Sequence, residues 1–321
     1  MNNTIKLAFL GAVALATSST AALAGSELVR GLTTGLSVGM PLPEGVYDIS
    51  VGSYGGWDAK TAPMGLNEAY AIPVWLIWWT PWQILGGRVE FDTTTGVGDL
   101  WNAGNTWHPL NVNRTIASQD GIGLDSWLNT LVEAGIGWNL GGGWGVSLHA
   151  GAWLPSTQTV PSLLGRNYTA FQGAAAVSYV ANGWNLSATG IYGSGGGEET
   201  VLLPFGPATA RQAEWVNLDL TATKHFGKAE VGAVAYGSWD LTNSGEVTCY
   251  LSGGTAASLA PCKQHQFAVG SLVGYDFGIF LAQAKLTWDV EESNYRGKET
   301  RGSLTIVKPL WIAMPPEAPL K

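Results

Sequence analysis

The sequence predicts an all-β protein, a transmembrane antiparallel β-barrel of about 12 strands with short periplasmic turns and long extracellular loops. Three observations support this fold class. Charged residues make up only 12 % of the 321 residues, about half the ~25 % typical of soluble domains. Segments of about ten residues alternate between apolar and polar side chains, and short and long connections alternate between them. The alternative is a secreted all-β domain whose apolar residues form an internal core.

Residues 1–24 have the features of a secretory signal peptide. Lys6 precedes a short apolar run, and the small-residue motif Ala22-Leu23-Ala24 precedes Gly25. The run is too short for a spanning helix, and no later window supplies the ~20 apolar residues that such a helix needs. We therefore expect export to the bacterial outer membrane.

The rest of the chain divides into three parts. Residues 25–44 contain glycine and proline and are largely apolar. They form either a periplasmic lead or a plug inside the lumen, and the lead is the simpler assumption. Residues 45–311 form the barrel without an internal domain boundary, and residues 312–321 form a C-terminal tail.

Alternation and turn residues locate the strands of the barrel. We expect short turns near residues 80–82, 141–143, 181–183, 227–228 and 278, and longer loops that include residues 194–213 and 241–263. The expected strands are residues 46–54, 70–79, 83–92, 126–140, 144–154, 168–180, 184–193, 214–226, 229–240, 264–277, 279–290 and 299–311.

The same alternation assigns side chains to lipid or to the lumen. In residues 214–226, Leu218 and Leu220 alternate with Asp219 and Thr221, so the leucines face lipid. The charged residues assigned to the lumen are Arg88, Glu90, Asp92, Glu133, Asp219, Lys285, Asp289 and Arg301. These charges either line a selective path or pair with one another and only pack the interior.

Tryptophans lie beside the expected strand ends, where an indole ring prefers the membrane interface. The residues assigned to the periplasmic girdle are Trp78, Trp79, Trp82, Trp138, Trp144, Trp184 and Trp311. Those near the outer ends are Trp57, Trp127, Trp153, Trp215, Trp239 and Trp288. In a soluble sandwich the same residues would belong to the core.

The two cysteines, Cys249 and Cys262, fall in one expected outer loop. An exported chain meets an oxidising compartment, so we expect a disulfide between them. The bond either shapes the pore mouth or only protects a surface loop.

Motifs that could carry chemistry are weak. Ser147 and His149 share one strand face, as a barrel lipase would require, but no G-x-S-x-G elbow accompanies them. The glycine-rich residues 193–198 lack the lysine and the helix of a P-loop. His108, His225 and His265 have no metal-binding spacing.

We expect no catalytic site, metal or cofactor. The acidic balance, with a net charge of −8, argues against nucleic acid as a partner.

Several short motifs resemble a family of outer-membrane transporters of the meta-pathway of phenol degradation. Residues 39–47 (Gly-Met-Pro-Leu-Pro-Glu-Gly-Val-Tyr) are similar to the family's entry into its first strand. Residues 73–88 resemble its second hairpin, and residues 308–311 (Lys-Pro-Leu-Trp) resemble its closing strand. The chain departs from the pattern where residues 312–321 extend beyond the terminal aromatic residue.

The resemblance implies a twelve-stranded type of barrel and a role in the uptake of aromatic or other apolar compounds. We therefore expect a passive outer-membrane channel for small apolar or aromatic solutes. Its partners would be outer-membrane lipid, the solute and the barrel-assembly machinery during biogenesis. A lipid-acting enzyme and a structural barrel with a sealed lumen remain the alternatives.

Overall fold

A computed structural model describes most of the chain. The described residues are 29–57, 66–102, 124–155, 169–203, 206–245, 262–294 and 297–313. The predicted signal peptide and most of the predicted C-terminal tail lie outside them. Among the described residues, no helix is long and apolar enough to cross a membrane.

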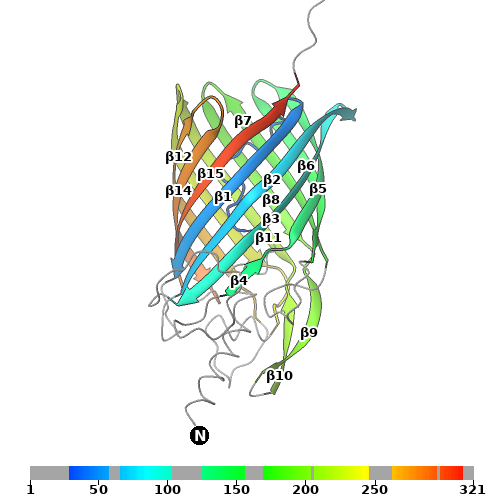
Figure 1. Ribbon diagram of the computed structural model, residues 1–321, viewed down its shortest axis with the longest axis vertical. Coiled ribbons are helices and arrows are strands. Elements are labelled where there is room, and N and C mark those ends of the chain that lie inside the picture. The colour runs from blue at the N-terminus through cyan, green and yellow to red at the C-terminus, as the bar shows by residue number, and fades with distance from the viewer. Residues whose placement is uncertain are drawn as a thin grey trace, which may run out of the picture.

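Twelve antiparallel strands form a closed barrel (Figure 1). β1 pairs with β15 along its whole length, from Gly45 opposite Ile312 to Trp57 opposite Glu299, and this pairing closes the sheet. The predicted all-β barrel of about 12 strands is confirmed. Its strands are β1 (Gly45–Trp57), β2 (Leu66–Ile84), β3 (Gly87–Asn102), β5 (Thr130–Gly141), β6 (Trp144–Leu154), β7 (Ala170–Ala181), β8 (Trp184–Gly193), β11 (Trp215–Phe226), β12 (Ala229–Asp240), β13 (His265–Asp276), β14 (Leu281–Ser293) and β15 (Glu299–Ile312).

The two ends of the barrel differ in their connections. At one end, short turns join consecutive strands, as at Asn182 and Gly183, which both have positive φ angles. Such turns match the twist of a hairpin. At the other end, consecutive strands are separated by longer stretches of sequence, as between Trp57 of β1 and Leu66 of β2. We call these the short-turn end and the long-loop end.

The long-loop end carries additional strands. β4 (Leu124–Trp127) pairs with the end of β3. β9 (Gly196–Leu203) and β10 (Gly206–Gln212) form a hairpin that projects beyond the barrel (Figure 1). The expectation of one loop over residues 194–213 is therefore wrong, because these residues pair with each other.

The expected turn at residues 80–82 is also wrong. β2 continues through Pro81 to Ile84, and the chain turns at Leu85 and Gly86. The pairing with β3 shifts register between Trp79 and Gln83. Such a bulge tolerates a proline, which has no N–H to donate to the ladder. Thr80 supports the bulge, since its hydroxyl donates to the Val89 carbonyl at 2.8 Å.

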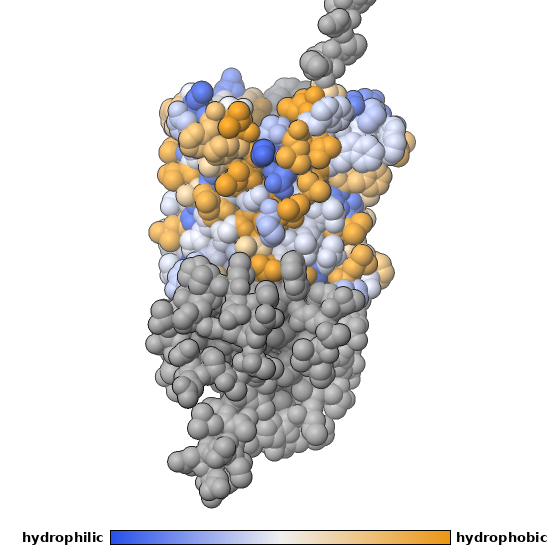
Figure 2. Space-filling model, in the orientation of Figure 1, coloured by the Kyte–Doolittle hydropathy of each residue, from blue (hydrophilic) through white to orange (hydrophobic). Residues whose placement is uncertain are grey.

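Side chains of the strands alternate between the lumen and the outer wall. Along β11, Asn217, Asp219 and Thr221 are buried, whereas Leu218 and Leu220 are only half-buried. Figure 2 shows apolar side chains spread over the visible outer wall. The outer wall thus presents the apolar surface that a lipid-facing strand requires.

The N-terminal segment lies inside the barrel. Residues 29–44 run through the lumen before β1 begins at the short-turn end (Figure 1). Arg30 contacts Glu299 of β15, and Gly39 contacts Ser178 of β7. The simpler assumption of a periplasmic lead is therefore wrong, because strands on several sides of the barrel bind this segment. We call residues 29–44 the lumen segment.

Several tryptophans face the lumen instead of forming girdles. Trp79, assigned to the periplasmic girdle, is only 3 % exposed and points inward. Trp57, Trp153 and Trp215, assigned to the outer ends, are buried as well. The lumen has room for these large rings, so proximity to a strand end does not determine the face. The other periplasmic assignments, Trp78, Trp82, Trp138, Trp144, Trp184 and Trp311, are exposed or half-buried.

We expect one disulfide in the loop after β12. Cys262 is disulfide-bonded, whereas Cys249 lies outside the described residues, so their pairing remains a prediction. Mass mapping of non-reduced peptides should recover one peptide pair that contains both cysteines. Reduction should leave the heat-modifiable barrel assembled, because the bond lies outside the strand ladder. Two alkylatable thiols in protein taken from the envelope would contradict the pairing.

Candidate functional site

The lumen segment is held to the barrel wall by polar contacts along its length. The Thr33 amide and hydroxyl donate to Asp219 at 2.9 and 2.7 Å. Nζ of Lys285 donates to the carbonyl and hydroxyl oxygens of Thr34, both at 3.0 Å. Near the short-turn end, Arg88 donates to the Leu42 carbonyl at 2.7 Å. Three of the charged residues assigned to the lumen thus bind the lumen segment.

Gly35 permits a close approach at the middle of this segment. Its φ angle is +89°, and a Cβ there would lie 2.7 Å from the Gln283 side chain. Its amide donates to Thr221, and its carbonyl accepts from Gln283 and Asn185. A larger residue would separate these groups from the backbone.

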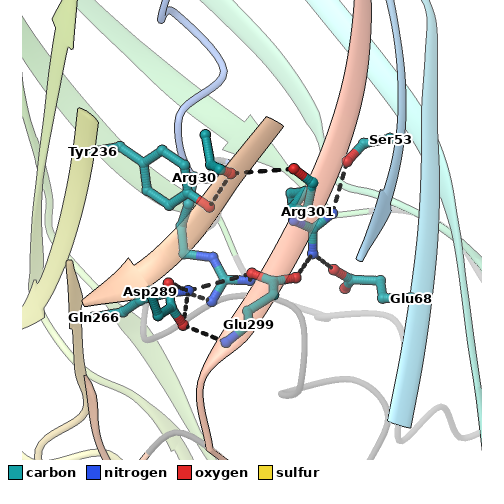
Figure 3. A network of polar contacts seen from close by, with 9 residues as sticks. Arg30, Ser53, Glu68, Tyr236, Gln266, Asp289, Glu299 and Arg301 are labelled. Atoms are coloured by element: carbon teal, nitrogen blue, oxygen red, sulfur yellow. Dashed lines mark hydrogen bonds and ion pairs between the residues drawn. The ribbon is translucent and has the colours of Figure 1, made fainter. Parts of the chain in front are cut away.

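A second set of charges forms a closed network near the long-loop end (Figure 3). Arg301 contacts both Glu68 and Glu299, and it donates to Ser53 at 2.8 Å. Arg30 of the lumen segment donates to Gln266 at 2.5 Å and lies 3.5 Å from Glu299. Gln266 in turn donates to Asp289. Asp289 and Arg301 therefore belong to an ion-pair network that packs the interior.

The remaining predicted lumen charges, Glu90, Asp92 and Glu133, gather on β3 and β5. Trp75 donates to Asp92 at 2.9 Å, and Gln172 donates to Glu133 at 2.7 Å. His149 lies beside them, with Nδ1 2.7 Å from a Glu90 oxygen. Among the described residues, Glu90, Asp92 and His149 form the one group of three or more histidine, cysteine or acidic side chains whose potential ligand atoms lie within 4.8 Å of one another.

An apolar cavity of about 270 Å³ lies between the lumen segment and the barrel wall. One side of it is formed by Leu36, Val38 and Met40 of the lumen segment. The wall contributes apolar and aromatic side chains from several strands together with the acidic group described above. The apolar and aromatic wall residues are Ile49, Trp75, Ile77, Trp79, Leu131, Ala174, Val180, Ile191, Leu281 and Val307.

Ser147 and His149 do meet, but not as a hydrolase requires. The Ser147 hydroxyl lies 2.7 Å from Nε2 of His149. However, it donates its proton to the Val38 carbonyl at 3.0 Å, and Ser147 is 1 % exposed. A nucleophilic serine must instead give its proton to the histidine and reach its substrate.

Some lumen residues are not predicted by the sequence pattern. Glu68 and Glu299 lie in or near expected loops, and Arg30 lies in the presumed lead. Glu230 binds Thr223 and Gln283 inside the barrel. For Glu230, the sequence supplies a signal, because it is the one charged residue in the otherwise apolar first part of β12, residues 229–237. Arg30 lies outside any strand, so no alternation of side chains could have predicted that it faces the lumen.

The sequence profile of the family described as "Putative MetA-pathway of phenol degradation" matches residues 68–306. The chain belongs to this family. The match spans β2 to most of β15, so it covers nearly the whole barrel of this member of the phenol-degradation family. No curated protein sequence matches the chain.

Solved outer-membrane barrels share the fold of this family member. The COG4313 outer membrane channel from Pseudomonas putida F1 is 14 % identical, with a TM-score of 0.60 over 84 % of this chain and 97 % of that one. The CymD monoaromatic hydrocarbon channel is 11 % identical, with a TM-score of 0.44 over 84 % and 89 % of the two chains. The likeness to the COG4313 channel shows an outer-membrane barrel fold and does not by itself identify a solute.

Proposed function

We propose that this protein is a passive outer-membrane channel for small apolar or aromatic compounds. The apolar cavity inside the barrel is the observation that carries the proposal. Its 270 Å³ exceed the ~150 Å³ of an engineered apolar cavity that binds benzene, so a single-ring compound fits. Membership of the phenol-degradation family supports this solute class.

The cavity can bind an apolar ring by burying its surface away from water. Trp75, Trp79 and Leu131 supply aromatic and aliphatic contacts. The nearby acidic group and Gln172 supply polar groups that can orient a hydroxyl. The solute moves down its concentration gradient, and a displacement of the lumen segment opens the path past Leu36 and Met40. The proposal includes no catalytic step.

Two parts of the proposal concern biogenesis. The predicted signal peptide directs the chain across the inner membrane, and the barrel-assembly machinery then inserts the barrel into outer-membrane lipid. The outward apolar side chains of the strands support insertion.

Filling the cavity should stop uptake. Ala174 lines the cavity on β7, so Ala174→Trp places an indole in the space that a solute would occupy. We expect intact cells with this variant to take up radiolabelled phenol no faster than cells without the protein. The assay compares initial rates with those of a sugar of similar size.

The neighbouring Ala175→Trp is the matched control. Ala175 is exposed on the outer wall, so its indole points toward lipid and uptake should match that of the unchanged protein. Equal rates for both variants would contradict the cavity as the route. Absence of phenol uptake by the unchanged protein would favour a sealed structural barrel, and release of fatty acids from lipid would favour an enzyme.

A further inference from the structure

Four side chains of the lumen form what we call the carboxylate–histidine cluster: Glu90, Asp92, Glu133 and His149. They come from the adjacent strands β3, β5 and β6. Gly135 of β5 pairs with Glu90 on one side and with His149 on the other. A Cβ on Gly135 would lie 2.6 Å from Nδ1 of His149 and 2.7 Å from the Glu90 carboxylate. The absence of a side chain at Gly135 thus lets Glu90 and His149 converge.

The cluster concentrates negative charge away from water. Glu90, Asp92 and Glu133 are 5, 6 and 8 % exposed. Asp92 and Glu133 stand directly opposite each other in the ladder, a pairing that is unfavourable for like charges. In the described part of the chain, no lysine or arginine forms an ion pair with these carboxylates, and their one cationic neighbour is His149, 2.7 Å from Glu90 and 3.6 Å from Glu133. A single imidazolium cannot balance three buried carboxylates, so the cluster still requires a bound cation or shared protons.

The hydrogen bonds of His149 determine which ring nitrogen faces the carboxylates as an acceptor. Ser147 donates its hydroxyl proton to the Val38 carbonyl, so its oxygen accepts from Nε2 of His149 at 2.7 Å. In the neutral imidazole, Nδ1 then carries a lone pair. Nδ1 is buried without a hydrogen bond, although a Glu90 oxygen lies 2.7 Å away. The side chain of His149 is only 6 % exposed.

We propose that the cluster binds a divalent cation of the Zn²⁺ class. Nδ1 of His149 and one oxygen each from Glu90 and Asp92 would be its ligands, since such atoms of these three residues lie within 4.8 Å of one another. Zn²⁺ accepts mixed nitrogen and carboxylate ligands. Glu133 lies 3.6 Å from Nδ1 and can complete the set.

Neighbouring residues form hydrogen bonds with the cluster that are typical of those around metal ligands. A ligating histidine usually donates its other N–H to a fixed acceptor, which here is Ser147. Ligating carboxylates are likewise hydrogen-bonded, as Asp92 is to Trp75 and Glu133 is to Gln172. Through Ser147 and Val38, the cation would also hold the lumen segment against β6. The proposal does not depend on the solute that the channel carries.

Zn²⁺ itself is the probe for the first test. Tag-free protein in detergent, treated with a chelator and then dialysed, is titrated with zinc chloride in a calorimeter. We expect one high-affinity site per chain. X-ray absorption of the loaded protein should show one imidazole and oxygen ligands at about 2.0–2.2 Å. Absence of binding, or a spectrum without imidazole, would overturn the proposal in favour of shared protons.

Variants assign the zinc site to the cluster. His149→Gln and Gly135→Ala should abolish the high-affinity site, the latter without removing a ligand. Ser147→Ala should weaken zinc binding by about 10–100-fold, the usual effect of losing an outer contact. His265→Gln is the matched control, because His265 lies 3.4 Å from Glu291 outside the cluster, and it should bind zinc as tightly as the unchanged protein.

Heat-modifiable mobility in a gel confirms that each variant is a folded barrel. Ser147→Ala, the mildest change, tests the proposal even if the other two fail to fold. Unchanged zinc affinity in any folded cluster variant would overturn the assignment. A failure of phenol uptake would leave the zinc result intact, so the two proposals fail separately.

Discussion

Replacing Arg301 with methionine is expected to lower the free energy of unfolding by about 3–5 kcal/mol, the usual cost of breaking a buried ion pair. Arg301 is buried and contacts both Glu68 and Glu299. Its guanidinium also lies 5.0 Å from the centre of the Tyr70 ring. Methionine can fill much of the same space, but it leaves two carboxylates inside the barrel without this counter-charge.

Chemical denaturation in lipid vesicles would measure this loss. Arg88→Met is the matched control, because Arg88 is half-buried and donates to one backbone carbonyl; its cost should be clearly smaller. Adding Glu68→Gln to Arg301→Met should recover part of the loss, because Glu68 pairs with Arg301 and its buried charge is then removed with its partner. Equal destabilisation by both arginine variants would contradict the importance of the network.

Placing a charge on the lipid-facing side of β11 should have the second-largest effect. Leu220 lies near the middle of β11, opposite Ala188 of β8 and Ala235 of β12. Leu220→Arg should cost about 2–4 kcal/mol, as expected for arginine near the bilayer midplane. Folding yield and denaturation in vesicles would both report this loss.

Phe226→Arg provides a depth control on the same strand face. Phe226 is exposed at the short-turn end of β11, where an arginine should cost only about 0–1 kcal/mol because the interface is near. A similar cost for Leu220→Arg and Phe226→Arg would mean that the membrane does not cover the middle of this strand.

The alternation of side chains was sufficient to predict the fold and the inward face of most strands. Side chains of a strand alternate with a period of two, so each residue lies on one of only two faces. Because the chain has few charged residues, the polar face of a strand is easy to recognise. Leu218 and Asp219 therefore fall on the predicted sides. The turn after Trp79 was missed because a bulge can absorb Pro81, which local sequence does not distinguish from a turn.

The faces of large aromatic residues were less predictable. An indole suits either an interface or a roomy lumen, so Trp78 and Trp79 look alike in the sequence although they face opposite ways. The contacts within the candidate site could not be predicted from the alternation of side chains, for a different reason. His149 finds Glu90 across Gly135, and Arg30 finds Glu299 269 residues away, so only the register of the closed sheet brings them together.

The contact between Arg30 and Glu299 also has a consequence for the order of folding. It joins the start of the described chain to its last strand, so it has one of the highest contact orders that the molecule allows. Contacts of this kind form late, because the entropy of closing so long a loop must be overcome first. A chain interrupted before β15 would lack both this contact and the β1–β15 seam. The interior of the barrel therefore depends on completion of the whole chain, and a truncated product would present an unfinished interior to quality-control proteases.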